Sequence, residues 1–356
     1  MSLDEVDYKI LTALSKNPLG RINELSKQAE VSDKTFRQRF SKLIENKIFL
    51  GVSAQICYPT LSLDPILIFA NAKFRNIGIL EDMCDLHPYT RYRIRCLGAV
   101  NGLIMFFAVP TGSYSLLFEL LDELCDRGLI INYTYSIPIG KCICVEHDFS
   151  YYDVENDSWS FNWADWEDYL SSMNPPPKIE ECPPSILHKM DDRDMLILRY
   201  LTINARVKLK YLSRKCNVPI YHLSRRIKFY RRSGVIDSFR VIISSKASRL
   251  FDLFHFKCKC SVKVTAKFAK AILKIPFQAT LIPLTDGFML QIFLPPSNIS
   301  SIGEILQKYC DDVQFIWGDY KSSKRYWFYH EPFVNGKWLS SREYMVDNVL
   351  KELFME

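Results

Sequence analysis

Two short segments of the sequence place DNA-contacting side chain types at helical spacing. In the first, Phe36, Phe40 and Leu43 recur at the spacing of one helix face, so the other face points outward. Arginine and glutamine suit paired hydrogen bonds to guanine and adenine, which favours a base-contacting helix. The predicted outward residues are Lys34, Thr35, Arg37, Gln38, Arg39 and Ser41.

The second segment repeats this pattern with a stronger positive charge. Its apolar face consists of Leu223, Ile227 and Tyr230. Residues 186–250 hold 16 Lys and Arg against four acidic residues, whereas residues 146–182 hold ten acidic residues against one Lys. Such segregation favours a polyanionic partner. We predict base contacts from Tyr221, His222, Ser224, Arg225, Arg226 and Lys228, and phosphate contacts from Arg206, Lys208, Lys210, Arg231 and Arg232.

Two alternatives to DNA contact stay open for these residues. The basic faces could be the solvated sides of structural helices, or surfaces for protein contacts. Arg39 and Arg226 are equally suited to brace their helices internally.

Cysteine and histidine form two mirrored clusters whose residue types suit zinc. The first contains Cys142, Cys144 and His147, and the second contains His255, Cys258 and Cys260. On a strand, residues two apart share a face, so each Cys pair could chelate locally. However, the spacing is not a standard zinc spacing, and 11 cysteines cannot all pair. We therefore expect reduced, mostly buried thiols and no metal or cofactor.

An internal repeat supplies the elements that would position these residues. Shifted by 187, residues 3–14 align with residues 190–201, and the register continues to Arg39 and Arg226. Shifted by 185, residues 102–110 align with residues 287–295. Two such stretches in the same order indicate two similar halves joined by the proline-rich segment 174–185. We predict a tandem duplication whose halves form an intramolecular pseudo-dimer.

Each half begins with three short helical patterns and a strand-like wing (48–58 and 235–245), which predict a winged helix–turn–helix. A βαββαβ pattern follows, typical of a ferredoxin-like module. In the second half its first strand is predicted at 254–264 and its first helix at 266–275. The fold class is α+β. The predicted domains are 1–60 and 186–248 (winged helix–turn–helix), 61–140 and 249–320 (ferredoxin-like), 141–185 (acidic aromatic tail and linker) and 321–356 (aromatic tail).

Both tails carry tryptophans that we interpret as packing or assembly surfaces. A helix is predicted at 163–171 and another at 341–354. The second would open with Ser340 and Glu343 as a capping box.

The order of these elements resembles the Lrp/AsnC (feast–famine) family of transcription regulators. Residues 223–236, with Arg226 and Gly234, are similar to the end of the family's helix–turn–helix. The resemblance implies a sequence-specific regulator of double-stranded DNA, controlled by a small effector such as an amino acid. The family binds effectors near a Gly-x-x-Asp turn, which implies Gly98, Asn101 and Asp286 here. A tight turn that only joins two strands is the alternative.

One enzyme class shares the resemblance: the siroheme decarboxylases, tetrapyrrole enzymes built of similar paired halves. Their second strand carries a His-Asn-Tyr-x-Arg-like motif, whereas this chain has Thr90, Arg91, Tyr92 and Arg93 in one half and residues 279–282 in the other. We also find no Gly-rich phosphate loop, HExxH or GxSxG motif. The sequence therefore predicts a regulator rather than an enzyme, with a siroheme decarboxylase as the alternative.

The composition excludes other classes. Apolar residues make up 48% and charged residues 24%, as in folded globular proteins. No uninterrupted apolar run reaches the length of a membrane span, and the acidic start does not look like a secretory signal. We expect a cytoplasmic protein without a membrane partner.

Overall fold

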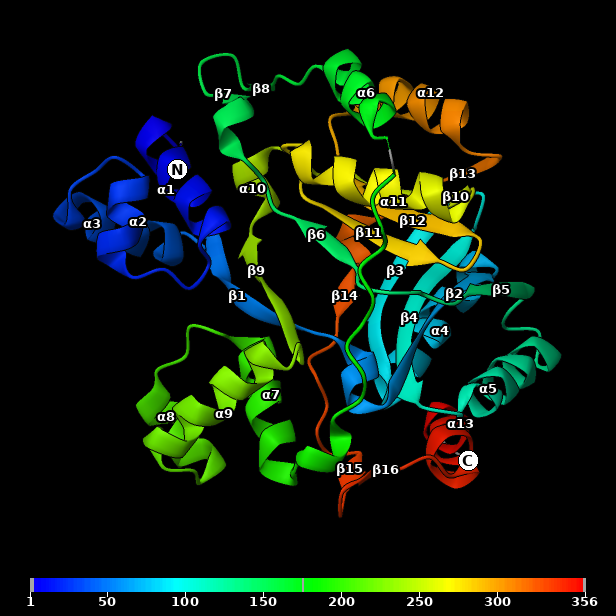
Figure 1. The fold of residues 1–356 in the computed structure, drawn as a ribbon. Helices are drawn as coiled ribbons and strands as arrows, with labels where there is room; N and C mark the ends of the chain where they lie inside the picture. The colour runs from blue at the N-terminus through cyan, green and yellow to red at the C-terminus, as the bar shows by residue number, and fades with distance from the viewer. Residues whose placement is uncertain (1–2, 175, 355–356) are drawn as a thin grey trace.

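The computed structural model describes residues 3–174 and 176–354, in which two helical heads flank one side of a large sheet assembly (Figure 1). Each head is a winged helix–turn–helix. Asp4 caps the first helix and Asp191 its counterpart, each in a reciprocal capping box with the third helical residue. The first head consists of α1 (Glu5–Lys16), α2 (Ile22–Gln28), α3 (Asp33–Glu45) and β1 (Phe49–Ile56), and the second of α7 (Asp192–Ile203), α8 (Leu209–Cys216), α9 (Ile220–Arg232) and β9 (Ile236–Ile243).

The two wings pair with each other as antiparallel strands. In this ribbon, Ser53 lies opposite Arg240 and Val52 opposite Val241. Ser53 and Arg240 are also equivalent under the 187-residue shift of the repeat. A local two-fold axis between the halves therefore passes between these two residues.

Each half continues with a βαββαβ module, as expected. The short helix α10 (Ser245–Ser248) precedes the second module. The first module comprises β2 (Leu63–Asn71), α4 (Ile77–Leu86), β3 (Thr90–Gly98), β4 (Gly102–Pro110), α5 (Tyr114–Asp126) and β5 (Asn132–Ser136), and the second β10 (Leu253–Lys259), α11 (Val262–Ala271), β11 (Ala279–Leu284), β12 (Gly287–Phe293), α12 (Ile299–Tyr309) and β13 (Asp312–Gly318).

The two modules form one continuous sheet. It is joined where β13 pairs with β3 through residues 316–318 and 96–98. The opposite edges also meet, because Pro138 bridges Leu284 and the Ile139 N–H donates to Pro283 O at 2.8 Å. The inner faces of the modules are thereby brought toward each other, while their helices cover the outer faces (Figure 1).

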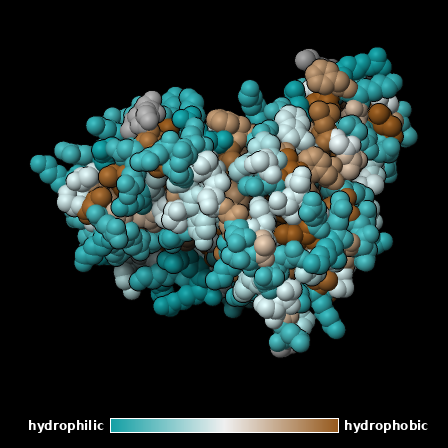
Figure 2. Space-filling model, turned by 90° about the horizontal axis from the view of Figure 1, so that it is seen from above, coloured by the Kyte–Doolittle hydropathy of each residue, from teal (hydrophilic) through white to brown (hydrophobic). Residues whose placement is uncertain are grey.

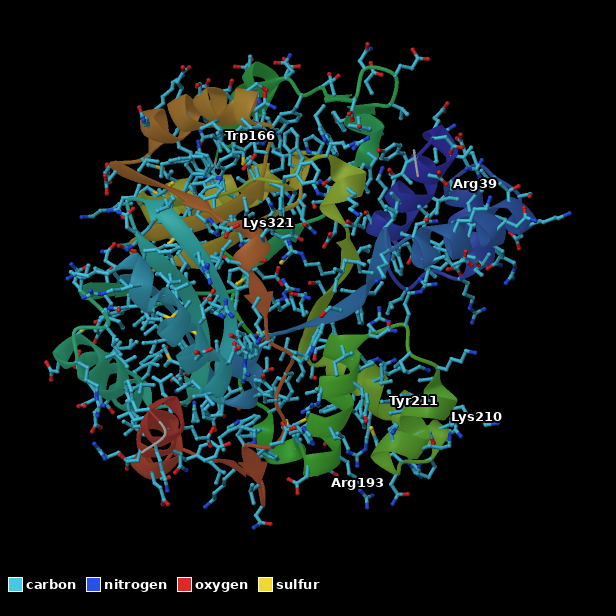
Figure 3. The ribbon with its side chains drawn as sticks, turned by 180° about the vertical axis from the view of Figure 1, so that it is seen from behind. Arg39, Trp166, Arg193, Lys210, Tyr211 and Lys321 are labelled. Carbon is cyan, nitrogen blue, oxygen red and sulfur yellow. The ribbon has the colours of Figure 1, made fainter. Side chains whose placement is uncertain are left out.

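The tails after each module cross to the other half. In the first tail, β6 (Ile143–Val145) pairs with β11, and in the second, β14 (Lys324–Arg325) pairs with β3. Trp163 and Trp166 of the first tail pack in the core of the second module, as Figure 3 shows for Trp166. The remaining tail elements are β7 (Tyr152–Asp153), β8 (Ser158–Trp159), α6 (Trp163–Ser172), β15 (Phe333–Val334), β16 (Lys337–Trp338) and α13 (Asn348–Phe354).

Two local predictions are wrong. The strand predicted over 254–264 ends at Lys259, because Ser261 caps α11 by accepting from the Val264 N–H. The predicted capping residue Ser340 is also displaced. The Ser341 hydroxyl accepts from the Tyr344 N–H instead, and the last helix opens with a π-helical turn at Glu343–Asp347.

In the described ranges, no helix is both long and apolar enough to cross a membrane. The face shown in Figure 2 is mainly hydrophilic, with separated hydrophobic spots.

Candidate functional site

A cavity lies on the local two-fold axis, between the inner faces of the modules and the paired wings. Its volume is ≈ 200 Å³. A neighbouring hollow of ≈ 260 Å³ shares Tyr92, Arg240, Gln291, Arg325 and Trp327 with it, so the two adjoin. Small-molecule sites usually occupy about 300–1,000 Å³. Each hollow alone is smaller than this range, so a large ligand would need both of them or a movement of the walls.

Two cross-strand rows form opposite walls of the cavity. Residues directly opposite each other on paired strands share a sheet face, which places each row's side chains together. The first row is Leu67, Phe106, Tyr92 and Arg325, on β2, β4, β3 and β14. The second row is His255, Gln291, Thr280 and Cys144, on β10, β12, β11 and β6. All eight residues line the cavity.

Two arginines give the cavity an excess of positive charge. Arg240 lies 3.5 Å from the Glu146 carboxylate and donates to the Thr280 hydroxyl at 3.2 Å. Arg325 has no carboxylate partner among the described residues. Arg325 stays exposed to solvent, and the nearby charge of Arg240 disfavours its ionised form. Two neighbouring guanidinium groups that repel each other favour an anionic ligand.

A third guanidinium, that of Arg91, lies in the wall without an acidic partner. Arg91 is only 2% exposed, and its Nε and Nη2 atoms have no hydrogen-bond partner. The pairing of β3 with β4 skips Arg91, so the residue occupies a β-bulge between Thr90 and Tyr92. Bulges occur often beside active sites, where they redirect a side chain. The rings of Tyr58 and Phe328 lie 5.4 and 5.7 Å from this guanidinium.

Neutral polar groups meet between the two rows. The Gln291 amide donates to Tyr92 Oη at 3.0 Å and lies 3.2 Å from His255 Nε2. His255 is buried and its Nδ1 atom has no partner. A side chain at Gly318 would lie 2.7 Å from the His255 ring, so the glycine makes room for the imidazole.

Burial determines the protonation states of His255 and Tyr92. Desolvation lowers the pKa of His255 from 6.5 to about 3, so the ring is neutral at physiological pH. Desolvation also raises the pKa of Tyr92, whose hydroxyl stays protonated. The cavity wall thus carries a neutral imidazole and a protonated hydroxyl, which Gln291 joins.

The structure does not bring the two predicted Cys/His clusters together. Cys142, Cys144 and His255 line the cavity, but His147 accepts from the Gln278 N–H elsewhere, and Cys258 and Cys260 lie in the core. No group of three or more His, Cys, Asp or Glu side chains in the described ranges is arranged to hold a metal ion. The mirrored pattern is wrong as a ligand set, because its two parts lie on different strands and faces.

Most residues predicted to contact DNA lie on the surface of the two heads, and none of them lines the cavity. Figure 3 shows Arg39 on the first head and Lys210 on the second. DNA contact by these residues stays a prediction, which the structure does not test. The exposed ones are Lys34, Arg37, Gln38, Ser41, Lys208, Lys210, Tyr221, His222, Arg225, Lys228, Arg231 and Arg232, while Thr35 and Ser224 are half-buried.

Three of the predicted DNA-contacting arginines are engaged inside the protein. Arg39 forms ion pairs with Asp4 and Asp7 at 2.7 and 3.4 Å. Arg226 forms the same pairs with Asp191, at 2.8 Å, and with Asp194. The contacts of Arg39 and Arg226 therefore match the alternative in which these arginines brace their helices internally.

Arg206 was expected to contact phosphate, but it joins the two heads instead. It donates to the carbonyls of Pro18 and Gly20 at 2.7 and 3.3 Å, and its guanidinium lies over the Phe40 ring.

The residues implied as an effector site are not among those that line the cavity. Asn101 bonds within its own turn, donating to Gly98 O at 3.1 Å, and Asp286 O accepts from the Cys260 N–H. These contacts match a turn that joins two strands. Effector binding at Gly98, Asn101 and Asp286 stays a prediction.

Sequence reasoning missed Arg240, Gln291 and Arg325. Arg91, Tyr92 and Thr280 were noted only as departures from an enzyme motif. A signal was available in the repeat, because Phe106 aligns with Gln291 under the 185-residue shift. Where one half has an apolar core residue and the other half has a polar residue at the same position, the polar residue indicates a buried site.

Comparisons with known proteins place this geometry in context. The whole chain is similar in fold to the crystal structure of the siroheme decarboxylase NirDL, with 13% identity, a TM-score of 0.54 and 99% of each chain covered. Its complex with an iron-uroporphyrin III analogue gives a TM-score of 0.53 at the same identity and coverage. Escherichia coli AsnC is 21% identical over 39% of this chain and 93% of its own, with a TM-score of 0.33. No protein-family model and no curated protein sequence matches the chain.

These findings overturn the prediction of a transcription regulator that is not an enzyme. The similarity that spans the chain is to an enzyme structure, whereas the similarity to regulators covers about 39%. The error has a physical reason: basic outward helices and a ferredoxin-like module belong to a shared scaffold, and the scaffold does not specify the site. The α+β fold class, with winged helix–turn–helix and ferredoxin-like parts in each half, is as predicted.

Proposed function

We propose that the protein is a decarboxylase of an iron tetrapyrrole that carries several carboxylate side chains, of the siroheme type. The observation that carries this proposal is the cavity on the local two-fold axis, whose lining includes three arginines and a buried histidine. The chain-wide similarity to a siroheme decarboxylase structure supports the choice of substrate class.

Binding would depend on the unpaired positive charge. Arg325 and Arg240 face the same space, and Glu146 balances only one of them. Carboxylates of the substrate would replace water around these guanidiniums and relieve their mutual repulsion. Guanidinium–carboxylate pairs are strong because two parallel hydrogen bonds form. The apolar walls, with Leu67, Ile104 and Phe106, would cover the macrocycle.

The reaction needs one proton for each carboxylate lost. When the bond between the carboxylate carbon and its methylene breaks, CO2 leaves and the electron pair stays on the methylene carbon. A proton must then reach that carbon. His255 is the candidate donor, because bound carboxylates raise the pKa of a buried imidazole by stabilising its charged form. The substrate itself would therefore protonate the histidine that acts on it.

Tyr92 and Gln291 would position this donor. Gln291 contacts both the tyrosine hydroxyl and the imidazole, so the three side chains are held as a unit. The protonated hydroxyl of Tyr92 can donate a hydrogen bond to a substrate carboxylate. The conjugated macrocycle supplies the electron sink when it is bound.

The test uses iron-uroporphyrin III as a binding probe and siroheme as a substrate. We expect the probe's absorption spectrum to shift on titration with protein. We expect siroheme incubated anaerobically to lose the mass of one CO2 for each carboxylate removed. A probe spectrum that is unchanged at saturating protein, with unaltered siroheme, would contradict the proposal.

A further inference from the structure

One segment closes the cavity from outside: residues 176–186, here called the strap. In Figure 1 it runs across the sheet assembly between α6 and α7. The Lys141 N–H donates to Glu180 O at 2.8 Å, and the Ile186 N–H donates to Thr60 O at 2.9 Å. The Lys141 ammonium also pairs with the Glu180 carboxylate. Few backbone bonds hold the strap, so local opening costs little.

Two glycines let the strap lie close to the protein. A Cβ at Gly140 would lie 2.6 Å from Glu180 O, and one at Gly234 would lie 2.7 Å from the Pro183 ring. Both glycines have positive φ, at +67° and +75°. The close fit is therefore built into the backbone on both sides of the strap.

Two cysteines meet where the strap passes the wing. Cys182 belongs to the strap, and Cys57 directly follows β1. Both line the cavity, and both are free thiols. The Cys182 thiol donates to Gly140 O at 3.2 Å. The backbone holds the two cysteines near each other, because the Cys57 N–H donates to Val235 O at 3.0 Å and the adjacent Gly234 packs against Pro183, the residue after Cys182. The interaction with Cys57 lowers the pKa of the Cys182 thiol, so Cys182 is the more readily ionised of the two.

We propose that Cys57 and Cys182 form a reversible disulfide that fixes the strap to the wing and closes the cavity. The oxidant is a small-molecule disulfide such as oxidised glutathione. The Cys182 thiolate attacks one sulfur of the reagent and releases one glutathione thiolate. The Cys57 thiolate then displaces the second glutathione from the mixed disulfide. Two protein thiols lose two protons and two electrons, and the reagent becomes two thiols.

The consequence of closure for a tetrapyrrole rests on the proposed function, but the disulfide does not. The strap and the end of β1 contribute Cys182 and Cys57 to the wall of one cavity. A large planar ligand would enter when the strap moves away from this wall, and cross-linking the two cysteines would prevent that movement. Oxidised protein should therefore bind such a ligand more slowly, and reduction should restore the rate.

The first measurement maps the disulfide. The full chain is incubated with oxidised glutathione, alkylated and digested, and cross-linked peptides are identified by mass spectrometry. We expect a peptide joining Cys57 to Cys182, which Cys57→Ser and Cys182→Ser abolish. Cys144→Ser, at a thiol of the same cavity, should leave it unchanged. A cross-link of Cys142 to Cys144 or Cys182 instead, or none in protein whose thiols react when denatured, would overturn the assignment.

The second measurement reports closure without a tetrapyrrole. Trypsin can cut after Lys178, an exposed residue of the strap. We expect cleavage there to slow about tenfold or more on oxidation, because proteolysis follows the open population. We expect a similar fall in the association rate of iron-uroporphyrin III. A formed disulfide that changes neither rate would overturn the closure. A probe that does not bind even reduced protein contradicts only the proposed function, since the trypsin result still decides the closure.

Discussion

The two rows of the cavity occupy equivalent positions in the two halves, yet they carry different chemistry. The first half presents Leu67 and Phe106 where the second presents His255 and Gln291. In addition, the tail of the first half contributes Cys144 to the second row, where the tail of the second half contributes Arg325 to the first row. Equivalent backbone thus supports an apolar wall on one row and a buried imidazole on the other.

The unequal rows show how a symmetric scaffold can acquire a single reaction centre. A true two-fold dimer would present each polar group twice, and buried polar groups without partners are costly. Here Gln291 contacts Tyr92 from the opposite row, so the polar groups satisfy one another across the axis. The apolar equivalents need no such partner. Three tests address this comparison.

The largest effect should come from the proposed proton donor. We expect His255→Gln to lower siroheme turnover by about 10²–10⁴-fold, as for loss of a general acid, with little change in probe affinity. His147→Gln is the matched control, because His147 is equally buried but lies outside the cavity lining. Steady-state kinetics of both variants decide the point. Equal losses of siroheme turnover in the two variants would show that the second row holds no special proton donor.

A smaller effect should follow loss of the unpaired charge. We expect Arg325→Gln to weaken iron-uroporphyrin III binding by about 10–100-fold, because a charged hydrogen bond is worth about 1.5–3 kcal/mol. Lys324→Gln removes the same charge from the neighbouring residue, which pairs with Asp85 outside the cavity. Titrations of the two variants at one ionic strength separate a local contact from a change in net charge. Equal weakening would assign binding to the overall charge.

The smallest effect concerns acid stability. Burial lowers the pKa of His87, His147 and His255 from 6.5 to about 3. The unfolded chain therefore binds more protons below pH 6.5, and stability present above that pH is lost as the pH falls towards about 3. Each histidine contributes at most about 1.4 kcal/mol per pH unit.

Denaturant unfolding of the wild type, His147→Gln and His255→Gln between pH 7 and 5 measures this contribution. Each variant should show a shallower fall in stability than the wild type. Bound iron-uroporphyrin III should reduce the contribution of His255 alone, since only that histidine faces the ligand. If the ligand changed the pH dependence of stability equally in both variants, the placement of His255 against the ligand would be contradicted.

Much of the fold was predictable because its helices and strands are long enough to show periodicity. The stripe of Phe36, Phe40 and Leu43 predicts α3, whose Phe36 and Leu43 are fully buried. The crossing tails were not predictable, since β6 and β14 are three and two residues long and show no period. Their pairing is decided by the distant strands that receive them.

The site was less predictable than the fold. His255, Cys142 and Cys144 were singled out for metal chemistry, but only the cavity explains why they come together. Arg240 lies on a wing and Arg325 in a tail, more than 80 residues apart in the chain. Their proximity depends on the wing pairing and on the crossing of the second tail, neither of which has a local sequence signal.

The crossing of the tails also determines when the protein can fold during synthesis. β6 leaves the ribosome before its partner β11, which follows more than 130 residues later. At about 5–20 residues per second, that strand waits roughly ten seconds for its partner. The first wing likewise waits for β9, and β3 waits for β13 and β14. The first half therefore emerges with unpaired strand edges, and only completion of the second half removes them.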